Sequence, residues 1–429
     1  MINHGDKVRL ITKDGESFEG IYIDTPELSG KDFITLKLSS GYNIGISKKE
    51  ISSLDLIKKN IPPEEKTQVI KKKKDLPSIS LLSTGGTISC KVDYRTGGVN
   101  PKITAQDFIN NVPEITKYAN INARQVMQIP SENLTVKDWQ KLAREIYKEI
   151  KKGTDGIVVT MGTDTLHYSA AAISFMLKNL NVPIVFVGAQ RSVDRGSSDA
   201  YPNLLSAVMT ASKWDGAEVI ICMHKTTNDG LNMLIRGVKA RKMHTERRDA
   251  FRPINDLPLA FIDYERGLIT PKSNYRKRSK ELPKLEIEMD EKVGLIYIYP
   301  NMKQDVLQHF IDNDYHGVVL AGTGFGHVPT GPSNSLLPVL KRFNNKGIPV
   351  IMTSQCLYGR TNPYVYSPLR QLSMEAKVIF AEDMLPEVAY IKLMHILGKT
   401  KDLEEIKKLM LTNMVGEINP LSQVNSFLI

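Results

Sequence analysis

Residues 79–88 read ISLLSTGGTI, a short apolar run that ends in a paired-glycine turn with a threonine on either side. The same rhythm returns in GIVVT at 156–160, PIVFVGA at 183–189 and EVIICM at 218–223, with segments of helical length between them. Short apolar runs that alternate with helical segments are typical of the buried parallel strands of α/β proteins. The sequence therefore predicts a mostly parallel α/β sheet over residues 78–270.

A second series of the same kind follows further along the chain. KVGLIYIYP at 292–300, GVVLAG at 317–322 and PVIMTS at 349–354 repeat the apolar pattern, and two helical segments end the sequence. We therefore expect a second α/β domain with terminal helices over 291–429, joined to the first by a basic linker at 271–290.

The first 60 residues follow a different pattern. KVRLIT, SFEGIYI, FITLKL and YNIGI read as short strands joined by tight turns such as Asp14-Gly15. This predicts a small β-barrel of the SH3 or Sm type over residues 1–60. Residues 61–77, rich in proline and charge, predict an exposed linker. The expected fold class is thus α/β, a two-domain parallel-sheet core preceded by a small N-terminal barrel.

The composition restricts the class of protein. A chain of 429 residues with 41% hydrophobic and 24% charged residues can bury an enzyme-sized core, and no apolar run approaches the ~20 residues of a membrane span. Cys90, Cys222 and Cys356 are far apart and form no CxxC pair, so we expect neither structural disulfides nor a metal site. These features indicate a cytoplasmic protein without membrane contact. The net charge of +10 favours a polyanionic partner without requiring one.

The turn after residues 79–83 is the first candidate for chemistry, because ligands of open α/β sheets bind beyond the carboxyl ends of the strands. Gly85 and Gly86 permit a sharp turn that brings backbone N–H groups near a bound oxygen, and Thr87 adds a hydroxyl directly after them. The structural alternative is a plain glycine turn in which Thr87 binds a local backbone group.

The loop after residues 156–160 reads MGTDT and places Thr163 beside Asp164 at the start of a helix. These residue types commonly cap helices, which is the structural alternative. In a site, the carboxylate can orient the hydroxyl, anchor a cationic amine of the substrate or hold a catalytic lysine. Lys242, in ARKMHT at 240–245, is available for that role, although most lysines only solvate a surface.

Taken together, TGGTI at 84–88, GTDT at 162–165 and ARKMHT at 240–245 resemble the bacterial-type L-asparaginase and glutaminase family. Supporting matches extend the resemblance over roughly residues 78 to 380, and they lie at 188–191, 198–204 and 322–326. The resemblance implies an asparaginase-like core of two α/β domains with the site between them. It also implies release of ammonia from the side-chain amide of glutamine or asparagine.

The resemblance assigns a role to each candidate side chain. Thr87 matches the nucleophile, and Tyr94 matches its hydrogen-bonding partner on a lid. Thr163, Asp164 and Lys242 match a second group, in which Lys242 eases the deprotonation of a threonine hydroxyl and Asp164 positions that lysine. Spacing does not decide which threonine attacks, and we favour Thr87 because it lies next to the lid.

Ser131 and Glu132, in PSENLT at 130–135, match the positions where the family binds the α-carboxylate and α-amine of its substrate. An ordinary serine-containing loop is the alternative. Met161 departs from the family pattern, because the family commonly has histidine at the position before GTDT.

The N-terminal extension, ARKMHTERRDAF and the terminal helices resemble instead the ammonia-supplying subunits of tRNA-dependent amidotransferases. That resemblance implies a second subunit, the E subunit, which uses ATP and Mg²⁺ to convert Glu-tRNA(Gln) to Gln-tRNA(Gln). It also implies a homodimer within a heterotetramer. This chain has no GxxxxGK[ST] phosphate loop, so we expect no cofactor in it. The basic segment at 266–284 has two interpretations, an ordinary solvated charged loop or a direct contact with tRNA phosphates.

Two other functions compete with an amidotransferase subunit. One is a free-standing L-asparaginase with an accessory barrel, and the other is a catalytically silent binding module whose threonines only cap helices. The extension and terminal helices favour the amidotransferase subunit over the first alternative. The joint presence of Thr87, Thr163, Asp164 and Lys242 disfavours the second.

Overall fold

The computed structural model describes most of the chain. The described residues are 2–3, 5–23, 32–39, 43–59, 73–86, 88, 112–192 and 197–428, together with the backbone of 90–92 and 99–101.

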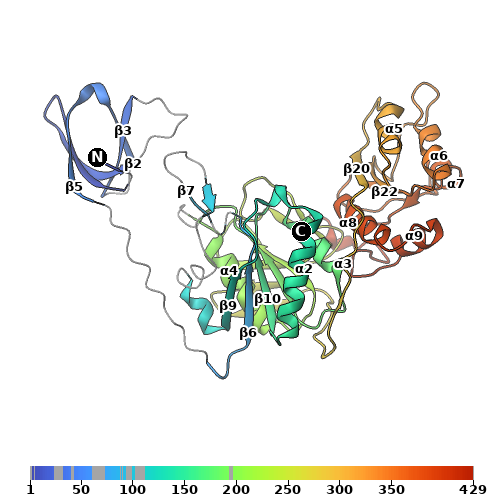
Figure 1. The fold of residues 1–429 in the computed structure, drawn as a ribbon, viewed down its shortest axis with the longest axis horizontal. Coiled ribbons are helices and arrows are strands. Elements are labelled where there is room, and N and C mark those ends of the chain that lie inside the picture. The colour runs from blue at the N-terminus through green and yellow to red at the C-terminus, as the bar shows by residue number, and fades with distance from the viewer. Residues whose placement is uncertain are drawn as a thin grey trace.

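The N-terminal unit is a curled five-stranded antiparallel sheet with the order β4-β3-β2-β1-β5 (Figure 1). Alternate side chains of its strands enclose a small core that includes Val8, Leu10 and Leu36. This unit is the expected small β-rich domain. Its elements are β1 (Lys7–Thr12), β2 (Ser17–Ile23), β3 (Phe33–Leu38), β4 (Asn43–Ser47), the short 3₁₀ helix η1 (Lys48–Glu50) and β5 (Ile51–Lys58).

The first α/β domain is built on an eight-stranded sheet with the order β18-β17-β14-β13-β12-β10-β6-β9. The five strands from β9 to β13 in this order are parallel, and β14, β17 and β18 add an antiparallel edge. The expectation of a mostly parallel sheet is confirmed. The strands are β6 (Ser78–Ser83), β9 (Asn120–Gln125), β10 (Gly156–Thr160), β12 (Ile184–Val187), β13 (Val219–His224), β14 (Leu231–Arg236), β17 (Ala260–Asp263) and β18 (Leu268–Pro271).

Helices cover both faces of this sheet because its strands are apolar on both sides. In β10, Ile157 and Val159 face one core and Val158 faces the other, as the two-residue period of a strand requires. The helices α2 (Val136–Lys151) and α3 (Leu166–Met176) pack on the first face, and α4 (Ala200–Lys213) packs on the second (Figure 1). The short helices are η3 (Pro113–Lys117) and η4 (Ser131–Asn133).

The second α/β domain has a four-stranded parallel sheet with the order β20-β21-β22-β23. Its outer face packs on α5, α6 and α7, and its inner face packs on α8, which also contacts α3 of the first domain. Therefore α8 joins the cores of the two domains. The elements are β20 (Val293–Tyr297), α5 (Gln304–Asp312), β21 (Gly317–Gly322), α6 (Leu337–Asn345), β22 (Val350–Ser354), α7 (Ser367–Met374), β23 (Ile379–Phe380), α8 (Pro386–Leu397) and α9 (Leu403–Met410).

The described residues also form three two-stranded ladders, and one of them carries Lys242. They are β7 (Cys90–Val92) with β8 (Val99–Pro101), β11 (Leu177–Lys178) with β19 (Lys284–Leu285), and β15 (Ala240–Lys242) with β16 (Phe251–Pro253).

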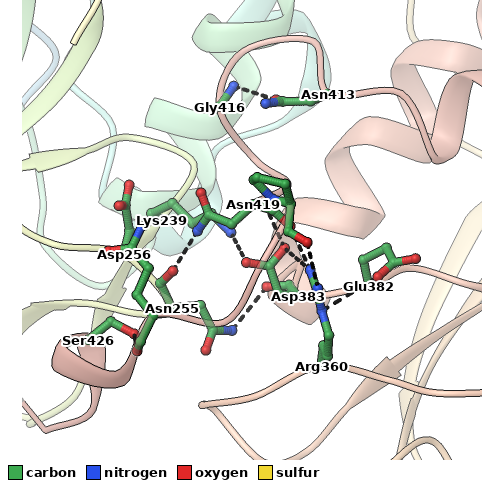
Figure 2. Close-up of polar contacts among 12 residues, drawn as sticks. Lys239, Asn255, Asp256, Arg360, Glu382, Asp383, Asn413, Gly416, Asn419 and Ser426 are labelled. Carbon is green, nitrogen blue, oxygen red and sulfur yellow. Dashed lines mark hydrogen bonds and ion pairs between the residues drawn. The ribbon is translucent and has the colours of Figure 1, made fainter. Parts of the chain in front are cut away.

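The C-terminal tail returns from α9 to the first domain and ends in the short helix η5 (Val424–Ser426). Asn419 is one of its polar anchors, because its side-chain amide donates to the carbonyl of Asn255 at 2.5 Å and its N–H donates to Asp383 Oδ1 at 3.0 Å. Figure 2 shows Asn255, Asp383 and Asn419 side by side, with Arg360 beyond them. The tail thus contacts both α/β domains.

Part of the basic segment between the domains is bound to the first domain rather than solvated. The Arg278 guanidinium donates to the carbonyls of Trp214 at 2.8 Å and Ala211 at 2.9 Å. These carbonyls lie at the C-terminal end of α4, where helical carbonyls lack intrahelical partners and favour cations. The interpretation as a solvated loop is therefore wrong for Arg278. Within the described residues, no helix is long and apolar enough to cross a membrane.

Candidate active site

The candidate site lies at the carboxyl ends of β6 and β10, where the strand order changes direction. From β6 the chain goes first to β9 on one side and then to β10 on the other, which makes this edge a switch point of the topology. The two strands end together, with Ser83 paired to Thr160. Thr84 then donates from its N–H at 2.9 Å and from its hydroxyl at 3.0 Å to the carbonyl of Thr160.

Glycines allow the two loops to approach each other closely. Gly86 has φ +89°, and a Cβ placed on it would lie 2.1 Å from the backbone nitrogen of Gly162. A Cβ on Gly162 would in turn lie 2.8 Å from the hydroxyl of Ser131, in the loop after β9. Therefore the backbones of three strand-end loops meet in contact, and larger residues would force them apart.

Lys242 joins the residues of the GTDT loop. Its Nζ donates to Thr163 Oγ1 at 2.9 Å and to Asp164 Oδ1 at 2.7 Å, although the residues are 79 and 78 positions apart in sequence. The lysine side chain is 10% exposed and the Asp164 side chain is 68% exposed, so the group borders solvent on the carboxylate side. A hydroxyl, an amine and a carboxylate thus converge at hydrogen-bonding distance.

Ser131 contacts the same loop. It is buried in η4, and its carbonyl accepts a hydrogen bond from the Thr165 hydroxyl at 2.6 Å. Glu132, the next residue, is exposed at the rim. The structure therefore brings Ser131, Thr163, Asp164 and Lys242 together, with Glu132 adjacent.

Thr87 and Tyr94 lie outside the described residues, so their assigned roles stay predictions. Gly86 and Ile88, the described neighbours of Thr87, follow β6, and Ile88 is buried in the core of the first domain.

Met161, which departs from the family pattern, is a core residue. Its side chain is buried in the cluster that contains α2 and α3, and its N–H donates to the carbonyl of Val187 at 3.1 Å. The position before GTDT thus contributes packing to this site.

The segments at 188–191 and 198–204 also meet. The Asp199 carboxylate accepts from the N–H groups of Gln190 and Arg191 at 3.0 Å, and the Asn203 amide donates to the carbonyl of Gly188 at 3.0 Å. Since Asp199 precedes α4 and Gly188 follows β12, this network fixes a fourth strand-end loop at the same edge of the sheet.

Sequence reasoning missed three charged or titratable residues behind the site. Glu387, in the first turn of α8, accepts from Arg241 Nη1 at 2.8 Å, and His167 Nε2 lies 3.8 Å from its other carboxylate oxygen. Burial lowers the pKa of His167 to about 3, helped by the nearby Arg241 and Lys242 cations, so this imidazole is neutral and forms no ion pair. In the sequence, the only feature that could have pointed to this group was the position of Arg241 directly beside Lys242.

Chemically, the arrangement provides a hydroxyl within proton-transfer distance of an amine that a carboxylate orients. Backbone N–H groups from the neighbouring glycine turn lie at the same edge. These are the components of nucleophilic catalysis by a threonine.

Family models match three parts of the chain. Asparaginase, N-terminal, matches residues 78–274, and the Glutaminase/Asparaginase C-terminal domain matches residues 292–410. The GatD N-terminal domain matches residues 2–57.

Full-length relatives and solved structures agree with these matches. The chain is 46% identical to the D subunit of glutamyl-tRNA(Gln) amidotransferase from Pyrococcus furiosus, over 100% of this chain and 98% of that protein. It is 46% identical to the protein of the same name from Methanobrevibacter smithii, over 100% and 96%. The thermostable L-asparaginase from Thermococcus kodakarensis superposes with a TM-score of 0.72 at 31% identity, over 80% of this chain and 100% of that one. L-asparaginase I from Vibrio cholerae gives 0.70 at 28% identity, over 80% and 99%.

Proposed function

This chain belongs to the family of glutamyl-tRNA(Gln) amidotransferase D subunits, and from that premise we propose that its threonine-lysine-aspartate site releases ammonia from glutamine. The chain is the amidohydrolase subunit of a tRNA-dependent amidotransferase. The observation that supports this site is the contact of Lys242 Nζ with both Thr163 Oγ1 and Asp164 Oδ1.

The first chemical step is attack by a threonine hydroxyl on the amide carbon. An unactivated hydroxyl is a poor nucleophile, so a base must remove its proton during the attack. In its neutral form Lys242 accepts that proton, and Asp164 accepts an N–H of the lysine and holds it in place. The 2.9 Å between Lys242 Nζ and Thr163 Oγ1 is suitable for the transfer.

Collapse of the tetrahedral intermediate breaks the carbon–nitrogen bond, and ammonia leaves with the transferred proton. Backbone N–H groups of the Gly85-Gly86 turn stabilise the oxyanion, an effect of about 3 kcal/mol per good donor. Water then hydrolyses the threonine ester and releases glutamate. We assign the first attack to Thr87, with Tyr94 as its hydrogen-bonding partner. We assign to Thr163 the role of relaying the proton between Thr87 and Lys242.

Ser131 and Glu132 hold the rest of the substrate. An exposed carboxylate at the rim suits the α-amine of glutamine or asparagine, and Ser131, in contact with Gly162, suits the α-carboxylate. These contacts select a free amino acid over a bare amide.

A second amidotransferase subunit receives the ammonia, as the family name implies. We assign to this E subunit the ATP, the Mg²⁺ and the conversion of Glu-tRNA(Gln) to Gln-tRNA(Gln), with no cofactor in the present chain. We further propose that two copies of this chain form a homodimer within a heterotetramer, and that this complex acts in the cytoplasm.

The test uses the full chain with and without its partner subunit. Thr163→Ala should lower ammonia release from glutamine by about 10²-fold or more, because it removes a reacting hydroxyl. Thr412→Ala is the matched control, since that hydroxyl is exposed and donates to the Lys408 carbonyl at 2.7 Å on α9. Undiminished glutaminase turnover in Thr163→Ala would refute the assignment.

A free-standing L-asparaginase is the second candidate function. The observation in its favour is that an L-asparaginase structure is covered completely by 80% of this chain. Under the first function, glutamine turnover rises when the partner and Glu-tRNA(Gln) are added. Equal turnover with and without them, together with preference for asparagine, would establish the second.

A further inference from the structure

Lys242 sits on a very short strand whose side chains alternate between the two α/β domains. Successive side chains of a strand point to opposite sides, so Arg241 faces one side of β15 and Ala240 and Lys242 face the other, while Lys239 lies in the bend directly before the strand. Ala240 is buried in the main core, and Lys242 reaches Thr163. Lys239 and Arg241 reach the second domain instead.

Each of these two cations meets a buried carboxylate near the start of α8. Lys239 Nζ donates to Asp383 Oδ2 at 2.8 Å, and Arg241 Nη1 donates to Glu387 Oε2 at 2.8 Å. The two acidic side chains are 3% and 2% exposed. Moving the strand away from α8 would leave buried charges without partners, which is strongly unfavourable.

Asp383 is fixed in turn by the C-terminal tail and by the segment after β16. It accepts the N–H of Asn419 at 3.0 Å, and its carbonyl accepts from the Asn255 amide at 3.1 Å (Figure 2). Asn255 lies two residues beyond β16, the partner strand of β15. Both strands of the ladder are therefore attached to the same short stretch of the second domain.

Glu387 also borders the other element that forms the site. Its second carboxylate oxygen lies 3.8 Å from His167, in the first turn of α3 and three residues after Asp164. One acidic side chain of the second domain thus contacts the residue before Lys242 and the helix that follows Thr163 and Asp164.

We propose that Glu387 and Asp383 are positioning residues for the amidohydrolase reaction: by binding Arg241 and Lys239 they set the place of β15, and so hold Lys242 on Thr163 and Asp164. The inference rests on the proposed function of Lys242. It makes the second α/β domain responsible for the geometry of a base that the first domain carries.

The position of β15 depends on these contacts because the strand is short. β15 has three residues and a single partner strand, so its ladder alone fixes it weakly. The Lys242 contacts are 2.9 and 2.7 Å long, and a displacement of about 1 Å can reduce a reaction rate by about 10²-fold. The pairs of Arg241 and Lys239 with buried carboxylates, one on the opposite side of the strand and one directly before it, oppose such a displacement.

The experiment compares Glu387→Gln and Glu149→Gln in the full-length complex. Glu387→Gln removes the charge that holds Arg241, so we expect kcat for ammonia release to fall by about 10- to 100-fold with KM nearly unchanged. Glu149→Gln breaks the pairs of a carboxylate that is 2% exposed with Arg124, 3.1 Å long, and with Lys152, 2.9 Å long, at the C-terminal end of α2 and near the start of β6, the end opposite the site. It should lower Tm comparably and leave kcat unchanged.

Two further variants separate positioning from general stability. Because Glu387 acts through Arg241, Arg241→Gln and the double variant Arg241→Gln/Glu387→Gln should have the same kcat. Arg241→Lys, which keeps a cation, should retain more activity than Arg241→Gln. All assays are run at a temperature where circular dichroism shows every variant folded.

The outcomes are distinct for the two hypotheses. Normal kcat in Glu387→Gln, an equal loss in Glu149→Gln, or additive losses in the double variant would overturn the positioning role. Lys242→Ala is assayed in parallel. Activity that persists in Lys242→Ala contradicts the proposed function, whereas an inactive Lys242→Ala beside a fully active Glu387→Gln contradicts only the present inference.

Discussion

The edge that carries the candidate active site and the junction between the domains both contain lysine–carboxylate pairs, in different surroundings. At the edge, Lys242 binds a carboxylate, Asp164, that is 68% exposed, whereas at the junction Lys392 and Glu417 are completely buried. An exposed carboxylate leaves room for a substrate and for proton exchange. A buried pair cannot change partners without leaving a charge in a medium of low dielectric constant. Exposure thus separates a pair suited to reaction from pairs that hold the fold together.

The largest effect on activity should come from Lys242→Met. Loss of the base should reduce ammonia release by about 10²- to 10⁴-fold. Tm should change little, because the Asp164 carboxylate that loses its partner is already solvated. Steady-state ammonia assays and thermal unfolding on the same preparation measure the two effects. A large drop in Tm would show that this pair is structural and would remove the contrast with the junction.

Lys392→Met should have the opposite effects, a large loss of stability and no loss of activity. It leaves Glu417 buried without its cation, which costs about 3–5 kcal/mol of unfolding free energy. The activity of the folded fraction should be unchanged, since neither residue contacts β15. Urea unfolding measures the loss, and the double variant Lys392→Met/Glu417→Gln should recover most of it. A stable single variant would contradict the role given to burial.

A smaller, pH-dependent effect is expected at Glu286, which binds Lys178 at 2.9 Å and also binds Lys399. Burial alone would raise the pKa of Glu286, but the two ammonium groups override it and lower the pKa from 4.5 to about 2. Since the folded pKa is the lower one, the carboxylate stabilises the fold above pH 4.5. That contribution is lost as the pH falls toward 2.

Glu286→Gln should therefore cost about 1–2 kcal/mol at pH 7, a figure reduced for partial solvent screening. The difference from the natural chain should narrow between pH 5 and pH 3 in urea unfolding. A constant difference over that range would mean that packing, not charge, is lost.

The smallest effect is expected at the surface. Lys277 and Asp215 form a 2.6 Å pair with side chains 63% and 60% exposed. Solvent screens such a pair, so Lys277→Ala should leave both Tm and ammonia release within experimental scatter. Differential scanning calorimetry at low and high salt checks this. A clear destabilisation would break the ranking of these pairs by exposure.

Local patterns predicted much of the fold. The segments of helical length expected between the apolar runs include α2, whose buried residues Val136, Trp139, Leu142 and Ile146 form one stripe behind the reciprocal Thr135–Asp138 capping box. The apolar runs that end in TGGTI and MGTDT became β6 and β10, neighbours in one parallel sheet. These predictions succeed because periodicity and capping are properties of short stretches of chain.

Other features have no local signal. Lys239 and Lys392 are buried, whereas lysine is usually exposed, and only a carboxylate far along the chain explains each. β15 is too short to show periodicity. Glu387 reads as an ordinary acidic residue in the first turn of a helix, and its partner Arg241 is 146 residues away.

By itself the sequence determined the β-rich start of the chain and the alternation of strands and helices after it, and it put forward the candidate reactive groups. The tertiary structure alone decided that Lys242 meets Thr163 and Asp164, and that the second domain braces the strand carrying Lys242 through Asp383 and Glu387. The physical reason is the distance along the chain over which each effect acts. Propensity and periodicity act over a few residues, whereas pairing of buried charges depends on which distant segments the packed cores bring together.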